Sequence, residues 1–553
     1  MASQLPEFPS LDLLRKRAKR LVRAASRGDG AALERCGAAV PRLADLDDDA
    51  ARAAVRLADA QHALARELGA ASWPKLKQRI ESLQPVAVQA ERLLAAVRQR
   101  RPRVARRLLR QNPALAGHDI FTACAAAAAE RVAAALGAEP GLAGTAHAPD
   151  GWAPLIYVGA SPFAAAGAKW AGALGRCAEL LLAHGADPNA CTVEAGAGDG
   201  GTDLTLPALY YACAGGQARV ARRLLERGAD PNDGESIFHA AEGNHRECLE
   251  LLVAHGADPS GRHPHWKNTP LFFLAGYRET DPSCATSTAG MQWLLEHGAD
   301  PNVTSSDAAE TPLHRIAALG RATAVAELLL AHGAAIDQPR ADGRTAYALA
   351  LRTGHAEMAD FLRSRGAAAA GLTPGDELLA ACMTADATAA DIARSLLARH
   401  PDLLAALGPE ERQALITAVE EGREASVRLM AGLGFDLRWE GSWAGTPLHH
   451  AAWRGRPAMV RLLLELGAPL DARDSQFGSS PLGWAAHGSS HHRRADDDYC
   501  AVVEALLDAG ADREASVNRW GEAPAALASR RVAALLKRRQ RLAQGDDRAL
   551  DRG

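Results

Sequence analysis

The sequence lacks the features that mark membrane and secreted proteins. None of its 553 residues fall in a run of 18 apolar residues, the length that a membrane-spanning helix needs. The first residues, MASQLPEFPSLDLLRKRAKR, contain no apolar segment of a secretory signal. The nine cysteines are scattered and include no C-x-x-C pair, which favours reduced thiols over a disulfide scaffold. We therefore expect a cytoplasmic protein without a transmembrane segment.

Motifs of catalysis are missing as well. No G-x-S-x-G, phosphate-binding loop, H-E-x-x-H or dinucleotide-binding fingerprint occurs in a suitable context. The sequence therefore predicts no enzyme, no cofactor and no metal site. Lysine is scarce too, at 7 of 63 basic residues, which indicates a GC-rich and hence bacterial genome.

The charge is unevenly distributed. The formal net charge is only -3, but residues 1–110 carry 23 Lys and Arg against 12 Asp and Glu. A basic head therefore precedes an acidic body. With 48% hydrophobic residues, so long a chain exceeds one ordinary core and must form several domains or a repeat array.

A repeated pattern settles that choice. The stretch TPLHHAAWRG begins at Thr446, and Gly467 follows 21 residues later in the ending LLLELGAPLD. Similar endings recur along the chain, for example LLLAHGADPN, LLERGADPN and LLEHGADPN. Self-similarity at about 33 residues is typical of a solenoid built from helix pairs.

The motif resembles the ankyrin repeat, and each residue type has a physical role in it. Thr446 is expected to cap a first helix that carries Pro447 in its first turn. Small Ala451 and Ala452 let neighbouring helices approach, and Gly467 is expected to end the second helix in a left-handed conformation. In this pattern, His314 and His449 are expected to form hydrogen bonds that fix the turn preceding each helix.

Counting intervals reveals further repeats without the motif. From Thr345 to Thr446 there are 101 residues, which leaves room for two degenerate helix pairs, and two more precede the first clear repeat. We expect an all-α ankyrin-repeat solenoid of about thirteen helix pairs with a small N-terminal helical domain. The predicted divisions are a basic helical domain at 1–88, degenerate repeats at 89–150, repeats at 151–370, degenerate repeats at 371–440, repeats and a cap at 441–541, and a tail at 542–553.

The head lies outside the repeat period. Helical spacing predicts helices in LDLLRKRAKRLVRAA, ALERCGAAV and RAAVRLADAQHALARELG, and another from Trp73 to about Leu83. Through LADAQHALARELGAASWPKLK this segment resembles the opening of a group of bacterial ankyrin-repeat proteins, a resemblance that implies a fold and no activity.

Some repeats and connections are longer than the pattern requires. Insertions are expected at SPFAAAGAKWAG, YRETDPSCA and GSSHHRRADDD, and long connections at 192–205 and 260–268. Loops on a rigid scaffold often carry specificity, whereas neutral drift is the alternative. His487, His491, His492 and Cys500 crowd one of these regions without a recognised metal-ligand spacing, so a solvated loop is favoured over a metal site.

Alignment of the repeats on Thr446 predicts a binding groove. The fifth residue of most first helices is a ring or an arginine, and the eighth lies one turn later on the same face. Such side chains are typical of protein-binding hot spots, whereas the alternative is that the rings pack inward. The predicted partner-binding residues are Tyr157, Tyr211, His239, Phe273, Arg315, Arg352, His450, Trp453, Trp484 and His487.

Two functions remain open from the sequence. The favoured one is a non-catalytic, monomeric scaffold or adaptor that binds a protein or peptide through this groove and the inserted loops. The alternative is an adaptor that meets nucleic acid or an acidic membrane through basic strips at 15–23, 98–110 and 530–541, although such strips are commonly solvated or paired with acidic residues.

Overall fold

The computed structural model describes most of the chain. The described residues are 11–148, 150–194, 203–277, 281, 283–305, 308–369, 372–491, 498–512 and 516–543. The chain divides into two compact units. Unit 1 comprises Met1–Pro264 and Ala289–Leu294, and unit 2 comprises His265–Thr288 and Leu295–Gly553.

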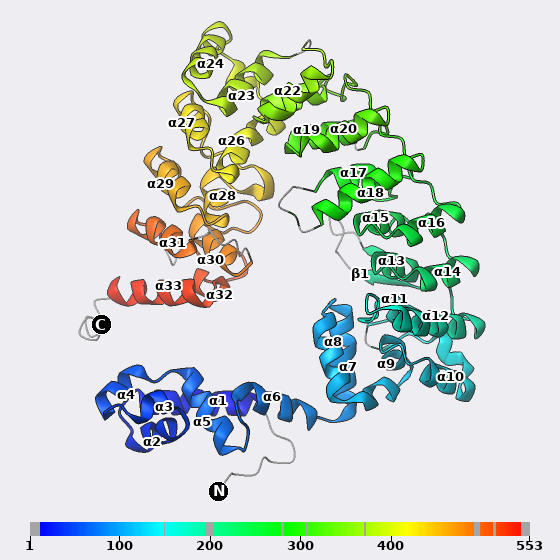
Figure 1. Ribbon diagram of the computed structural model, residues 1–553. Coiled ribbons are helices and arrows are strands. Elements are labelled where there is room, and N and C mark those ends of the chain that lie inside the picture. Colours follow the sequence, from blue (N-terminus) through cyan, green and yellow to red (C-terminus); the bar gives the residue numbers. More distant parts are fainter. Residues whose placement is uncertain are drawn as a thin grey trace. The chain divides into compact units, whose positions relative to one another are not determined.

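The head of unit 1 consists of six helices (Figure 1). They are α1 (Leu11–Ala25), α2 (Gly30–Ala39), α3 (Pro41–Ala44), α4 (Asp48–Ala54), α5 (Leu57–Glu67) and α6 (Trp73–Ser82). Apolar residues of α1, α2 and α5 pack into a core of their own, which includes Ala18, Leu21, Leu33 and Leu64. The predicted long helix at 52–69 is broken at Arg56, because Asp59 accepts a hydrogen bond from the Arg56 backbone N–H at 2.7 Å and starts α5 there.

The rest of unit 1 is made of helix pairs and one small hairpin. The helices are α7 (Val86–Arg98), α8 (Pro102–Gln111), α9 (Ile120–Ala125), α10 (Ala129–Ala138), α11 (Pro154–Gly159), α12 (Ala168–Ala183), α13 (Ala208–Ala214), α14 (Ala218–Glu226), α15 (Ser236–Glu242) and α16 (Arg246–Ala254), with 3₁₀ turns η1 (Pro113–Gly117) and η2 (Pro140–Gly144). First helices α9, α11, α13 and α15 contact one another in order, as do second helices α10, α12, α14 and α16.

Unit 2 is also made of helix pairs. Its helices are α17 (Pro270–Ala275), part of α18 (Cys284–Glu296), α19 (Pro312–Leu319), α20 (Thr323–Ala331), α21 (Ala346–Arg352), α22 (Ala356–Ser364), α23 (Pro374–Thr384), α24 (Ala387–Arg399), α25 (Leu403–Ala406), α26 (Pro409–Glu421), α27 (Glu424–Gly432), α28 (Pro447–Trp453), α29 (Pro457–Glu465), α30 (Pro481–His491), α31 (Tyr499–Asp508), α32 (Pro524–Leu527) and α33 (Arg530–Ala543), with a 3₁₀ turn η4 (Ser442–Ala444).

The described part of the chain holds thirteen helix pairs, from α7 and α8 to α32 and α33. The fold class and the repeat number are therefore confirmed. The two pairs inferred between Thr345 and Thr446 are α23 with α24 and α26 with α27. The degenerate pairs before the first clear repeat are α7 with α8 and α9 with α10. Counting intervals thus located repeats that carry no motif.

The repeat signature works locally as predicted. Thr446 and His449 form a capping box at the start of α28, and Pro447 occupies its first position, where no backbone N–H is needed. Gly467, after the second helix, has a φ of 83°, a left-handed conformation that would cost another residue about 1–2 kcal/mol.

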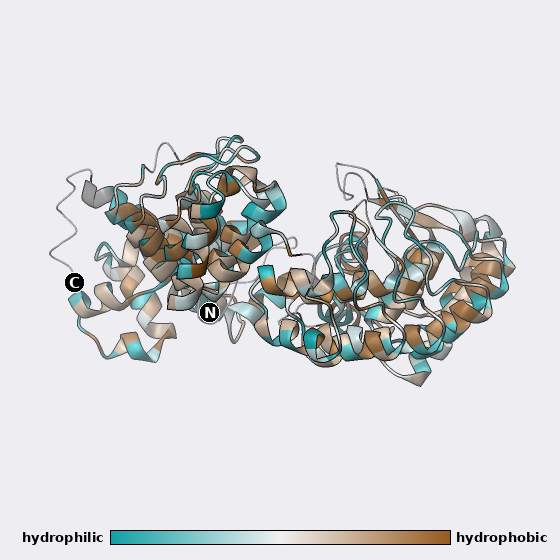
Figure 2. Cartoon of the chain, turned by 90° about the horizontal axis from the view of Figure 1, so that it is seen from above, coloured by the Kyte–Doolittle hydropathy of each residue, from teal (hydrophilic) through white to brown (hydrophobic). Residues whose placement is uncertain are grey.

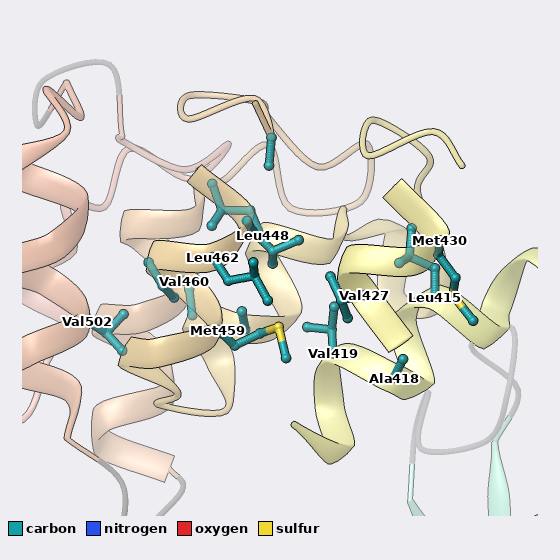
Figure 3. Close-up of a cluster of buried hydrophobic side chains, with 14 of the residues drawn as sticks. Leu415, Ala418, Val419, Val427, Met430, Leu448, Met459, Val460, Leu462 and Val502 are labelled. Atoms are coloured by element: carbon teal, nitrogen blue, oxygen red, sulfur yellow. The ribbon is translucent and has the colours of Figure 1, made fainter. Parts of the chain in front are cut away.

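The core of unit 2 lies between successive helix pairs (Figure 3). Leu448, Ala451 and Ala452 of α28 are fully buried, and Val460 and Leu463 of α29 close over them. Burying such an aliphatic side chain stabilises the fold by about 1.5–3 kcal/mol. In Figure 2 the helices carry hydrophobic and hydrophilic residues side by side, as amphipathic helices of a shared core must.

Three predicted loops differ in the structure. The connection at 192–205 includes a hairpin, in which β1 (Cys191–Glu194) pairs antiparallel with β2 (Leu204–Pro207). Helix α12 already begins at Ala168, inside the first predicted insertion, and α30 runs on to His491, inside the third. His492 and the acidic residues at 496–497 lie outside the described residues.

Candidate functional site

The two motif histidines link successive repeats. The Nδ1 atom of His449 accepts a hydrogen bond from the Thr446 backbone N–H at 3.1 Å, so Nε2 carries the proton and donates to the Ser479 carbonyl at 3.0 Å. His314 makes the same pattern with Thr311 and the Arg344 carbonyl. The predicted structural role of both histidines is confirmed. Burial lowers the pKa of His449 to about 4, so its ring is neutral at pH 7.

In unit 1, the predicted groove rings pack against one another. Tyr157 and Tyr211 each contact the ring of Trp152, at centroid distances of 5.2 Å. Tyr210 continues the row, 4.9 Å from Tyr211 and 5.0 Å from His239. Aromatic pairs at these separations stabilise a fold beyond their burial. The inward-packing alternative therefore describes most of this row.

Tyr157 requires a correction, because it was predicted to line a groove and has no exposed surface. Its hydroxyl donates to Asp150 at 3.0 Å and accepts from Arg98 at 3.0 Å. Burial raises the pKa of this hydroxyl well above its usual value. Tyr211 is 7% exposed, and its hydroxyl lies 3.2 Å from that of Thr192 on β1.

His239 is half-buried between two carboxylates. Its Nδ1 lies 2.8 Å from Glu242, and its Nε2 lies 3.4 Å from Glu235. Burial alone would lower its pKa, but the two carboxylates raise it to about 9. Glu235 also pairs with His263 at 3.0 Å. This predicted binding residue is therefore a charged member of an internal ion-pair cluster.

The predicted residues in the first part of unit 2 have different environments. Phe273 is half-buried, and Arg315 is exposed with its guanidinium 6.0 Å from the Phe272 ring. Arg352 requires a correction, because it is 5% exposed and pairs with Glu410 and, at 4.0 Å, with Asp376. The placement follows from charge, since a buried guanidinium needs carboxylate partners.

Arg352 belongs to a network that joins several repeats. Arg340 bonds Glu310 at 2.7 Å and Glu410 at 3.0 Å, and Arg344 bonds Asp376 at 2.6 Å. Arg340 is almost fully buried, so these contacts replace the water that its charge has lost. The network connects the degenerate repeats to their neighbours, and these repeats lack the Thr-Pro-Leu-His motif.

The last repeats of unit 2 enclose a cavity of about 510 Å³. Four of the chain's ten tryptophans line it. Its residues come largely from the neighbouring helices α28, α30 and α32 and the segments before them, and Figure 1 shows these helices in succession. We call it the aromatic cavity and define it by Glu420, Trp443, His450, Trp453, Arg454, Phe477, Ser479, Gly483, Trp484, His487, Asn518, Trp520, Glu522 and Leu527. It includes four of the predicted residues, namely His450, Trp453, Trp484 and His487.

A buried carboxylate positions the wall of the aromatic cavity. Asp474 accepts from the indole N–H of Trp484 at 3.0 Å and from the backbone N–H of Ser479 at 2.8 Å. It also accepts from the backbone N–H of Phe477. Gly445 allows a close approach on the other side, since a Cβ there would lie 2.7 Å from the Trp484 ring. Trp484 and the segment carrying Phe477 are thus held in one geometry.

One edge of the aromatic cavity is an ion pair. His450 donates from Nε2 to the Ser442 carbonyl at 2.9 Å, and its Nδ1 lies 3.0 Å from Glu420. Arg454 also bonds Glu420, at 3.0 Å. Burial opposes the ionisation of Glu420, but the bonds from His450 and Arg454 lower its pKa to about 2. His450 itself is 2% exposed.

Sequence reasoning missed Trp443, Phe477 and Trp520, because they lie in loops and not on the first helices. A signal was nevertheless present. Each of the three precedes by three residues the position just before a first helix, in SWAGTPL, QFGSSPL and RWGEAPA. The same alignment that selected helix residues would have selected this loop position.

The histidine-rich segment gives no ligand cluster in the described residues. His487 and His491 have ring centroids 4.2 Å apart, one turn apart on α30. Burial and then His491 lower the pKa of His487, so it is neutral at pH 7. Among the residues that the structure describes, no three His, Cys, Asp or Glu side chains are arranged to hold a metal ion.

The basic strips differ in how they are used. In the strip at 98–110, Arg98 pairs with Asp150, Arg100 with the Tyr210 hydroxyl, and Arg106 with the Pro162 carbonyl at 2.7 Å. In the strip at 530–541, Arg538 and Arg539 pair with Glu504 and Asp508. On α1 all six basic residues at 15–23 are exposed, although Arg15 pairs with Asp12 at 2.7 Å, and exposed arginines also occur in the other two strips.

A family model matches this chain in three places. The model, described as ankyrin repeats (3 copies), matches residues 163–263, 283–370 and 378–474, just over half of the chain. The chain belongs to the ankyrin-repeat family. Members of this family generally mediate protein–protein interactions and are generally not catalysts. Within the described residues, no helix is both long and apolar enough to cross a membrane.

Curated relatives share the repeats over limited lengths. The chain is 32% identical to the palmitoyltransferase Hip14 of Drosophila melanogaster over 18% of its own length and 14% of that protein. It is 25% identical to the E3 ubiquitin-protein ligase KEG of Arabidopsis thaliana over 55% of its own length and 19% of that protein. It is 32% identical to the human ankyrin repeat and SOCS box protein 11 over 23% of its own length and 36% of that protein. The chain thus spans about a third or less of these relatives.

A solved structure was also matched. The crystal structure of the human ASB11 ankyrin repeat domain is 26% identical, covers 41% of this chain and 98% of its own, and gives a TM-score of 0.27. The palmitoyltransferase and the ubiquitin ligase are much longer than the segments that match this chain, so the similarity to them concerns the repeats and assigns no activity.

Proposed function

We propose that this ankyrin-repeat protein is a non-catalytic, monomeric adaptor that binds a protein or peptide partner through the aromatic cavity. The observation that carries the proposal is the gathering of four tryptophans and Phe477 around one cavity in the last repeats. Tryptophan dominates protein-binding hot spots, where truncation of one ring costs about 2 kcal/mol or more. Of the predicted residues, the proposal retains Trp453, Trp484 and His487 as partner contacts. His450 was predicted to contact a partner as well, but it is 2% exposed and instead holds Glu420 and the Ser442 carbonyl.

The remaining divisions of the chain fit this role. The head has its own core, which supports a separate domain at 1–88, and the repeats follow to 541. Asp474 fixes two walls of the aromatic cavity, so little ordering opposes association. The degenerate repeats, held by the Arg340 network, serve as a rigid support for the binding repeats.

The test begins with selection of peptides from a displayed random library against the full chain. Affinity of the selected peptides is then measured for Trp443→Ala combined with Trp520→Ala, whose rings are 70% and 62% exposed and do not support the core. We expect roughly a thirtyfold loss or more, from about 2 kcal/mol. Trp170→Ala, a half-buried tryptophan of unit 1 outside the cavity, is the matched control. Equal affinity for both variants would refute the proposal.

A second candidate function rests on α1. Its basic residues Arg15, Lys16, Arg17, Lys19, Arg20 and Arg23 are all exposed, while Leu14, Ala18 and Leu21 face the core. Such a face suits nucleic acid or an anionic membrane. Binding of duplex DNA and of anionic vesicles at rising salt would test it, because phosphate contacts give a steep loss of affinity with salt. Unchanged binding after Lys16→Gln, Arg17→Gln and Arg20→Gln would exclude it.

A further inference from the structure

The aromatic rings that line the aromatic cavity are inclined to one another. Trp453 and Trp484 have centroids 6.0 Å apart and an interplanar angle of 74°. Phe477 lies 6.2 Å from Trp484 at 63° and 6.2 Å from Trp520 at 42°. Rings at such angles do not stack face to face. A cation in a space that several π faces border is attracted by the negative face of each ring.

Two carboxylates line the aromatic cavity, and they differ in their ion pairs. Glu420 is matched by Arg454 and His450, as described above. Glu522 receives a hydrogen bond from the Asn518 amide at 3.0 Å, but no cation pairs with it in the described part of the chain. The neutral ring of His487 adds no positive charge. Glu522 is therefore the carboxylate of the lining that is available to a positively charged group.

Trp443 is held at a conformational cost. Trp443 and Ala444 have φ values of 61° and 56°, in the left-handed region that bulky residues avoid. The Trp443 ring gains little burial in return, since 70% of it is exposed. Backbone strain of about 1–3 kcal/mol is characteristic of ligand-binding segments. The exposed Trp443 ring is thus held beside the cavity, where a ligand can reach it.

The chemistry of the walls distinguishes between kinds of cation. A primary ammonium is strongly hydrated and has three N–H groups that need acceptors. The lining of the aromatic cavity includes four tryptophans and Phe477, and Glu522 has no cationic partner among the residues that the structure describes. An alkylated ammonium presents methyl groups to the rings and loses less hydration on entry. A volume of about 510 Å³ also admits the chain that carries such a group.

We propose that the aromatic cavity binds an alkylated ammonium group, supplied either by a methylated lysine of a partner protein or by a small quaternary amine. The protein form of this ligand rests on the proposed function above. Trp443 and Trp520 form the outer walls, Trp453 and Trp484 form the inner walls, and Glu522 provides the compensating charge.

The first experiment compares choline with 3,3-dimethylbutanol, its uncharged isostere, in calorimetric titrations of the full chain. We expect choline to bind at least roughly tenfold more tightly, because only the cation gains from the ring faces. Trp443→Ala and Trp520→Ala are each expected to weaken choline binding roughly tenfold, while Trp170→Ala leaves it unchanged. Glu522→Gln should weaken choline and leave the isostere unaffected. Equal binding of choline and its isostere would overturn the proposal.

The second experiment identifies the source of the cation. Pools of short peptides with a central trimethyllysine are compared with pools carrying unmodified lysine or an uncharged tert-butyl analogue. Preference for trimethyllysine supports a protein ligand, and choline binding without any peptide preference supports a small amine. If display-selected peptides depend on Trp443 and Trp520 while no alkylammonium probe outperforms its isostere, the ammonium inference is wrong and the proposed function stands.

Folding of the variants is checked independently. Trp443 and Trp520 are exposed, so the thermal transitions of their alanine variants should match that of the wild type. Should either variant unfold, Glu522→Gln decides the question, because it keeps the shape of the side chain and its bond with Asn518 while removing the charge. An unchanged preference of Glu522→Gln for choline over its isostere would contradict the role of Glu522.

Discussion

The buried histidine His449 makes the stability of unit 2 depend on pH. Its pKa falls from 6.5 to about 4 on folding, chiefly because burial disfavours the charged ring. Asp474 and His450 act on it more weakly and in opposite directions. Between pH 6.5 and 4 the unfolded chain binds a proton at this position that the folded chain does not. Stability is therefore fully present above pH 6.5 and is lost as the pH falls toward 4.

The size of the effect follows from the two pKa values. Each pKa unit corresponds to 1.36 kcal/mol, so the full loss is about 3 kcal/mol. The measurement is urea unfolding followed by tryptophan fluorescence at several values between pH 7.5 and 4. Half of the chain's tryptophans lie between 439 and 520, so the signal reports strongly on these repeats. The comparison is with His449→Gln, which cannot titrate.

We expect His449→Gln to be less stable than the wild type at pH 7.5 and to lose less stability on acidification. The difference in pH dependence should approach about 3 kcal/mol by pH 4. His332→Gln, which alters an exposed histidine of the same unit, should follow the wild type at every pH. If the wild type and His449→Gln lose equal stability between pH 6.5 and 4, the reasoning is refuted.

Three further predictions concern stability and use the same unfolding assay. His239 has a pKa raised to about 9 in the folded chain, so its contribution to the stability of unit 1 is fully present below pH 6.5. Up to about 3 kcal/mol of the unfolding free energy should be lost as the pH rises through 9, and His239→Gln should not show this loss. Leu463→Ala should cost about 2–5 kcal/mol, whereas Ile392→Ala, at a side chain 48% exposed, should cost far less. Arg340→Ala should cost about 1.5–3 kcal/mol because it removes the charged hydrogen bond to Glu310, while Asp342 and Glu410 keep Arg344 and Arg352 as partners. Arg365→Ala at an exposed pair should cost about 1 kcal/mol or less.

The fold could be predicted from the sequence because each repeat reuses the same physical solution. A helix pair cannot bury its apolar face alone, so Leu448, Ala451 and their counterparts recur at fixed intervals. That constraint persists in degenerate repeats, where the Thr-Pro-Leu-His motif is lost but spacing remains. The interval between Thr345 and Thr446 was therefore sufficient to find two of them.

The departures from the prediction arise where local contacts outweigh periodicity. The strands at 191–207 have no partner outside their own hairpin in the described residues, and four-residue strands give too short a pattern to recognise. Helix α5 begins at Leu57 because of a single capping carboxylate, Asp59. Likewise, α30 extends to His491 through GSSH, a segment whose glycine and serines suggested a loop.

The candidate site was predictable in part for a related reason. Trp453 and Trp484 lie at repeated helix positions, so the alignment of the repeats found them. The same alignment also selected Tyr157, which is buried in the core, and Arg352, which is buried in the ion-pair network. A residue's position in the repeat determines where its Cα lies and in which direction its side chain leaves the helix. It does not fix whether a neighbouring ring or carboxylate will cover it.

The loop residues of the aromatic cavity show where recognition can vary in such a fold. Trp443 and Trp520 contribute little to the core, so selection on stability leaves these positions open to any residue that the turn tolerates. A large ring at such a position, kept there in a strained turn at Trp443, is therefore better explained by a ligand than by folding. It follows that substitutions of these two rings should change binding while leaving the unfolding transition in place, whereas substitutions of Asp474, which holds Phe477 and Trp484, should change both.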